Sequence, residues 1–293
     1  MKKLFLGLAA ILSLTLLSCN KDDSGLISSE DEAIIANDAA AEAITETADY
    51  EIELFSGSDA SVEIGDNSLK SLVACPFGGR YVVGQCPIVT IERTDGGYPI
   101  TKTLDYTDTV ELVNGMLISG KIIIVISAPP RTDGATRTVT FENFYIDDVK
   151  ISGTRVITFH SGEGTGISAT VEGDIMITFS DGTYIERTTE KLREFYEGYD
   201  TPYDISDDKF RITGFTNSVS SEGFTFSAVI TEPIIRLGTC RFAVQGIVQM
   251  FKNDELRLEL NFGDGTCDDV ATISRNGETK QITLGRRFRI RNN

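Results

Sequence analysis

From residue 86 onward, apolar and polar residues alternate in short runs that are rich in β-branched and aromatic side chains. A period of two is typical of a strand with one buried face, and Gly, Asp-Gly and Asn-Gly separate the runs as turn residues do. Asp181-Gly182 and Asn276-Gly277 fit two-residue hairpin turns, because such pairs accept the positive φ that these turns require. Strands are predicted at residues 88–92, 101–106, 121–127, 136–144, 154–159, 168–179, 184–190, 210–216, 224–231, 242–251, 256–262, 271–275 and 279–284.

The succession of these strands predicts an all-β fold. No helical patterns alternate with the strands, so parallel βαβ units are not expected. Short links between successive strands favour an antiparallel meander. We therefore expect a meander that buries one face by forming a curved sheet, a sandwich or a barrel. The charged stretch 190–198 fits either a helix or the continuation of a strand.

One amphipathic helix is expected before the β domain, at residues 30–54. Ser29 and Glu32 fit a capping box, and apolar residues recur at helical spacing at Ile34, Ile35, Ala41, Ile44, Ala48, Ile52 and Phe55. The surrounding segment 19–70 is strongly acidic, with 14 Asp and Glu against Lys21 and Lys70. We interpret it as an acidic tether that partly orders on the β domain 71–293, or alternatively as a spacer or docking helix.

The N-terminus predicts export. Met1-Lys2-Lys3 is followed by an apolar stretch at 4–17, which is shorter than the roughly 20 residues a transmembrane helix needs but suits a signal peptide ending at residue 18. Leu16-Leu17-Ser18-Cys19 resembles a bacterial lipobox, which implies that Cys19 is the lipid attachment site and carries fatty acids such as palmitate. The alternatives are an ordinary signal peptide with a nearby cysteine or a short buried helix.

The residues after Cys19 bear on localisation. Asn20 in place of Asp favours outer-membrane sorting, and Asn20-Lys21-Asp22-Asp23 resembles the signal that sends Bacteroidota lipoproteins to the cell surface. The chain is therefore expected to be lipid-anchored in the outer membrane, on the cell surface rather than the periplasmic face.

Two cysteine-led segments, 86–111 and 240–267, repeat each other as strand pairs that end in Asp-Tyr or Asn-Phe. The repeat predicts a disulfide between Cys240 and Cys267, and Cys75–Cys86 follows by exclusion, because exported cysteines tend to pair. The first segment has Glu111 near the position that corresponds to Cys267, so it lacks the equivalent disulfide.

The lipobox, the acidic tether, the cysteine-led strand pairs and the stretches 120–124 and 262–269 together resemble an uncharacterised family of surface lipoproteins from Bacteroidota-type bacteria. The resemblance covers most of the chain, but its motifs are structural. It implies no enzymatic activity that could be carried over to particular residues.

Charge and motif content narrow the functions further. With 27 Lys and Arg against 44 Asp and Glu, the net charge of −17 opposes nucleic-acid binding. The single histidine, His160, lies at a strand end and is interpreted as a surface residue. Nucleophile, phosphate-loop and dinucleotide motifs are absent, and no cofactor is expected. The chain is expected to be a non-enzymatic binding or structural module that meets the membrane and a glycan or surface protein. The alternative is a glycan-processing or other hydrolase with a carboxylate pair.

Two sets of residues are weak candidates for ligand binding. Aromatic and acidic residues gather at Tyr196, Tyr199 and Tyr203, where a ligand could bind, although a loop packed over the sheet edge is the preferred interpretation. Oxygen ligands for calcium crowd one turn at Asp264, Asp268 and Asp269, but the spacing does not match an EF-hand. The C-terminal arginines at 286–291 are expected to pair with the acidic tether, and the alternative is contact with anionic lipid head groups near the anchor.

Overall fold

The computed structural model describes residues 81–284 except 83–84, 96, 114, 130–131, 162–166, 201–205 and 241, together with ten positions between 41 and 56. The signal peptide, Cys19, residues 30–40 of the predicted helix, Cys75, Tyr203 and the C-terminal arginines lie outside the described residues. Within the described part, no helix is both long and apolar enough to cross a membrane.

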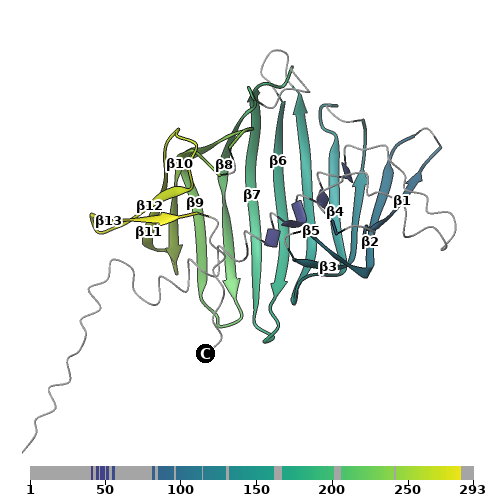
Figure 1. The fold of residues 1–293 in the computed structure, drawn as a ribbon, viewed down its shortest axis with the longest axis horizontal. Coiled ribbons are helices and arrows are strands. Elements are labelled where there is room, and N and C mark those ends of the chain that lie inside the picture. Colours follow the sequence, from purple (N-terminus) through teal and green to yellow (C-terminus); the bar gives the residue numbers. More distant parts are fainter. Residues whose placement is uncertain are drawn as a thin grey trace, which may run out of the picture.

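Thirteen antiparallel strands form one sheet in which every strand pairs with its neighbours in sequence (Figure 1). The strands are β1 (Ile88–Arg93), β2 (Ile100–Glu111), β3 (Leu117–Ile126), β4 (Thr136–Ile146), β5 (Val149–Ser161), β6 (Ile167–Thr178), β7 (Tyr184–Glu197), β8 (Lys209–Ser220), β9 (Thr225–Leu237), β10 (Gln245–Lys252), β11 (Glu255–Asp264), β12 (Val270–Arg275) and β13 (Glu278–Thr283). The predicted antiparallel meander is thus confirmed, and residues 190–197 continue strand β7.

The sheet is open, so the barrel, which was one of the three predicted forms, is wrong. β1 and β13 are the two ends of the strand order and do not pair, and they lie at opposite sides in Figure 1. A period-two pattern specifies that one face is buried but not whether the first strand meets the last. The closure of a sheet depends on accumulated twist and register across all strands, which local pattern does not contain.

One face of the sheet is buried along strands β2 to β7, and we call it the inner face. Along β2, Lys102, Leu104 and Tyr106 are buried, and the alternate residues point to the outer face. Register carries the inner face across the sheet, for example from Leu104 to Ile122 on β3. The inner-face side chains form the main hydrophobic core.

A helical segment packs on the inner face. All ten described positions between 41 and 56 are helical. Ile52 and Phe55 belong to the main core with β2 to β5, whereas Ala41 packs with residues of β6, β7 and β9 such as Ile177 and Phe226. Figure 1 shows the pieces of this segment crossing the middle strands, so its apolar stripe covers several strands at once.

Polar contacts also hold the segment to the sheet. The buried carboxylate of Glu51 accepts hydrogen bonds from the hydroxyls of Tyr81 and Tyr106, the latter at 2.6 Å. Glu51 is completely buried, and such a carboxylate is tolerated only with hydrogen-bonded partners. Burial raises the pKa of Tyr106 well above its usual value of 10.0, and the charge of Glu51 raises it further.

Two basic residues of the inner face contact the same segment. Lys102 Nζ donates to the carbonyl oxygens of Phe55 at 2.9 Å and Ser56 at 3.3 Å, so a buried cation of β2 contacts the backbone of the helical segment. Arg155 forms an ion pair with Asp49. Among the described residues, the sheet thus supplies an arginine that pairs with one carboxylate of the acidic segment and a lysine that binds its backbone.

The Tyr106 hydroxyl makes a testable contribution at high pH. In the unfolded chain a tyrosine loses its proton near pH 10, whereas the raised pKa keeps Tyr106 protonated in the fold. Its stabilisation is complete below pH 10 and is lost above it, by about 1.4 kcal/mol per pH unit. We expect urea unfolding between pH 9 and 11.5 to show a shallower decline for Tyr106→Phe than for the wild type. Tyr184→Phe, at an exposed tyrosine, should decline like the wild type; equal slopes for all three proteins would contradict the prediction.

Candidate ligand-binding site

Two strands bulge on either side of β3. Between Tyr106 and Val110, β2 contains two more residues than the matching part of β3, from Gly120 to Ile118. On the other side, β4 contains one extra residue where Lys121 pairs with Glu142. Bulges bend a strand and redirect its side chains, and they are frequent beside functional sites. The two bulges lie at the same level of the sheet.

Gly120 is the point at which β3 and β4 come close. Its φ is +86°, and a Cβ atom there would lie 2.0 Å from the carbonyl oxygen of Asn143. Asn143 itself has φ of 44°, which non-glycine residues rarely adopt. The local backbone thus requires glycine at 120.

A hollow of about 270 Å³ lies at this place. The residues that line it carry a lysine ammonium, a carboxylate, an amide and three hydroxyl groups, and they are Thr107, Ser119, Lys121, Glu142, Asn143 and Tyr145. On the opposite face of the same strands, Tyr106 and Phe144 pack edge to face with ring centroids 6.0 Å apart. The hollow therefore has a rigid, buried base.

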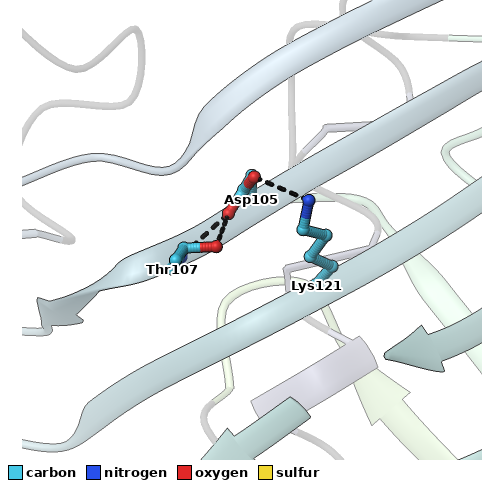
Figure 2. A network of polar contacts seen from close by, with 3 residues as sticks. All are labelled: Asp105, Thr107 and Lys121. Carbon is cyan, nitrogen blue, oxygen red and sulfur yellow. Dashed lines mark hydrogen bonds and ion pairs between the residues drawn. The ribbon is translucent and has the colours of Figure 1, made fainter. Parts of the chain in front are cut away.

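Asp105 holds two of the hollow's side chains in place, as Figure 2 shows. One oxygen lies 3.0 Å from Lys121 Nζ, and the other accepts from the backbone N–H of Thr107 at 2.9 Å and from its hydroxyl. Burial by itself raises the pKa of Asp105, but the hydrogen bonds from Thr107 and Lys121 outweigh it, and the pKa falls below 3.8. The Asp105 hydrogen bond raises the pKa of Lys121 in turn. Both side chains are therefore charged at neutral pH.

A second basic residue lies next to the hollow. Lys150 pairs with Tyr145 across β4 and β5, and its Nζ lies 6.0 Å from the centre of the Tyr145 ring. Glu142 is exposed and lies directly opposite Lys121. Around the hollow, positive and negative side chains thus alternate.

The structure places the predicted tyrosines elsewhere, at the far end of β7. Arg211 covers the Tyr196 ring at 5.6 Å and binds Glu194 through two hydrogen bonds of 2.7 and 2.8 Å. Tyr199 packs edge to face on Phe195. The two tyrosines thus contact different side chains, and Tyr203 lies outside the described residues, so ligand binding by these tyrosines stays a prediction.

The predicted disulfide between Cys240 and Cys267 is confirmed. Cys86 is also disulfide-bonded, and the predicted partner Cys75 lies outside the described residues. The first repeat lacks the equivalent disulfide, and hydrogen bonds connect its end to the residues before Cys86. The Val82 N–H donates to the Glu111 carbonyl at 2.9 Å, and the Glu111 N–H donates to the Gln85 side chain at 2.6 Å.

Two of the three aspartates in the predicted calcium turn accept hydrogen bonds from the residue two positions further along the chain. Asp264 accepts from the N–H and the hydroxyl of Thr266, at 3.2 and 2.8 Å, and these bonds lower its pKa. Asp268 accepts from the Val270 N–H at 2.9 Å. Across the described ranges, no group of three or more His, Cys, Asp and Glu is arranged to hold a metal ion.

Sequence reasoning missed the hollow, although one signal for it was present. A glycine inside a strand pattern suggests a bulge or a close approach of backbones, and Gly120 lies within the apolar run of β3. Nothing local connects it with Asp105 or Asn143, which come from other strands.

Comparison with protein-family models, with curated proteins and with solved structures finds no match to this chain.

Proposed function

We propose that this chain is a lipoprotein anchored in the outer membrane through Cys19, with a non-enzymatic β domain that binds a ligand in the hollow on its outer face. The cysteine-terminated signal sequence supports the anchor. The Cys240–Cys267 disulfide supports an oxidising compartment outside the cytosol. The acidic sorting residues after Cys19 favour the cell surface.

The preorganised Asp105–Thr107–Lys121 network is the observation that supports binding. Its side chains are fixed before any ligand arrives, which lowers the entropy lost on binding. A binding site needs such fixed polar groups, and the bulged strands supply them around a recess on a solvent-facing sheet.

A hydrolase with a carboxylate pair is less well supported. Such an enzyme needs a carboxylic acid whose pKa is raised so that it can donate a proton. Hydrogen bonds instead lower the pKa of Asp105, Asp181, Glu194 and Asp264. Glu172 and Glu190 do face each other across β6 and β7, but both are exposed on the outer face.

Replacing Cys19 tests the anchor. Each buried CH₂ group contributes about 0.8 kcal/mol to membrane binding, and two acyl chains give stable attachment. We expect the wild type to enter the detergent phase on Triton X-114 partition and Cys19→Ala to stay in the aqueous phase. Ser24→Ala, a few residues further along, should behave like the wild type. Unchanged partition of Cys19→Ala would remove the basis for the proposed location. Protease treatment of intact cells separately tests whether the protein is exposed on the cell surface.

A further inference from the structure

The charges around the hollow balance. Lys121 and Glu142, the two charged residues that line the hollow, have opposite charges, and the charged residues seen in contact with the lining, Asp105 at Lys121 and Lys150 at Tyr145, add one charge of each sign. Lys121 and Asp105 already neutralise each other at 3.0 Å. The two lysines would attract an anionic ligand while the two carboxylates repelled it, and a cationic ligand would meet the opposite forces. The site therefore favours a ligand without net charge, although the chain as a whole is strongly acidic.

The hydrogen-bonding groups match a ligand that both donates and accepts. Lys121 has three N–H donors, of which the ion pair with Asp105 uses one, and Glu142 offers acceptor oxygens only. Thr107, Ser119 and Tyr145 carry hydroxyls, which do both. Neighbouring hydroxyl groups on one ring can accept from an ammonium and donate to a carboxylate at the same time. A zwitterion would also be neutral but carries no neighbouring hydroxyls, so the test includes a zwitterionic probe.

The size of the hollow limits the ligand to one ring. Its volume of about 270 Å³ lies just below the range of roughly 300–1,000 Å³ that is usual for small-molecule sites. Glu142 and Asn143 at its margin are exposed, so the site is open on the solvent side. A unit bound there can belong to a longer chain that continues into solvent.

We infer that the hollow binds one sugar unit of a neutral glycan, with Lys121 and Glu142 hydrogen-bonding adjacent hydroxyls and Tyr145 contacting the ring. This inference rests on the proposed binding function and names its ligand. A single half-exposed ring held by a few hydrogen bonds binds weakly, with a dissociation constant on the order of 1 mM.

The test is a titration of the full chain with defined oligosaccharides, followed by calorimetry or by NMR. The neutral probes are tetrasaccharides of glucose, mannose and galactose. Tetragalacturonate is the anionic match of the galactose probe, and glycine is the zwitterionic probe. We expect at least one neutral tetrasaccharide to bind saturably and more tightly than tetragalacturonate or glycine.

Lys121→Met should weaken that binding about tenfold or more, because it removes a charged hydrogen-bond donor. Lys209→Met is the matched control: Lys209 is 40% exposed and pairs with Glu197 at 2.7 Å, whereas Lys121 is 39% exposed. Lys209→Met should bind like the wild type. Tyr145→Ala provides a second variant in the hollow and should also weaken binding.

Several results would overturn the inference, and they are distinguishable from failure of the proposed function. Equal or tighter binding of tetragalacturonate or glycine, or no neutral binding at 20-fold above the expected dissociation constant of about 1 mM, would exclude the sugar assignment. Neutral binding that Lys121→Met leaves unchanged would exclude the hollow while leaving a binding module. Cleavage of a tetrasaccharide, seen by mass spectrometry, would instead contradict the non-enzymatic function.

Discussion

Gly120→Ala is expected to destabilise the domain by about 3–5 kcal/mol, because it combines backbone strain with a steric clash. The new methyl group would lie 2.0 Å from the Asn143 carbonyl oxygen and 2.7 Å from the Phe144 Cα. Both neighbours are backbone atoms in a paired strand, so they cannot move aside as a flexible side chain could. The expected drop in the midpoint of thermal unfolding is roughly 10 °C, at about 2–4 °C per kcal/mol for a domain of this size.

Gly182→Ala is the control that separates the two causes. Gly182 has φ of +87°, nearly the same as Gly120, but a Cβ atom there meets nothing within 4 Å. It should therefore show only the conformational strain, about 1–2 kcal/mol. If both variants unfolded at the same urea concentration with equal m-values, the close approach of β3 and β4 at the hollow would be wrong.

Glu51→Ala is expected to destabilise the protein by about 3 kcal/mol or more, because it leaves two buried hydroxyls without their acceptor. Tyr81 and Tyr106 both donate to the same Glu51 oxygen, and all three side chains are at least 96% buried. The alanine also leaves a cavity between the helical segment and β2. Urea unfolding measures the loss, and limited proteolysis should show earlier cleavage in the region around residues 41–56.

Two variants test whether the loss at Glu51 is specific. Glu51→Gln keeps the shape and an acceptor oxygen, so it should cost less, about 1 kcal/mol. Glu186→Ala removes an exposed carboxylate of β7 and should change stability by less than about 0.5 kcal/mol. A Glu51→Ala protein as stable as Glu186→Ala would mean that the segment contributes nothing to the fold through this carboxylate.

Local sequence information predicted most of the strands well. Every predicted strand overlaps one of the thirteen observed, because side-chain alternation and turn residues such as Asp181-Gly182 act over a few neighbouring positions. Boundaries moved mainly where bulges extend a strand, as in β2, which continues past Tyr106 to Glu111. The repeat that predicted Cys240–Cys267 was likewise readable along the chain, because each copy keeps its cysteine at the start of a strand pair.

The candidate site was not predictable in the same way. Tyr196 and Tyr199 were candidates because they are close in sequence, and in the fold their rings contact Arg211 and Phe195. Asp105 and Lys121 were not selected as candidate binding residues, because each is an ordinary charged residue in a strand. Their pairing depends on the register between β2 and β3, which the whole sheet determines.

The order of polar and apolar residues, by itself, determined that this protein is a meander of antiparallel strands with one apolar face, and the cysteine repeat identified the disulfide that closes the β10–β11 hairpin. The tertiary structure decided that the sheet stays open, that an acidic helical segment covers its basic inner face, and that two bulges beside Gly120 form a polar hollow on the other side. The division has a physical reason: hydrophobic period and turn geometry involve neighbours in sequence, whereas closure, docking and register depend on contacts between residues far apart in the chain.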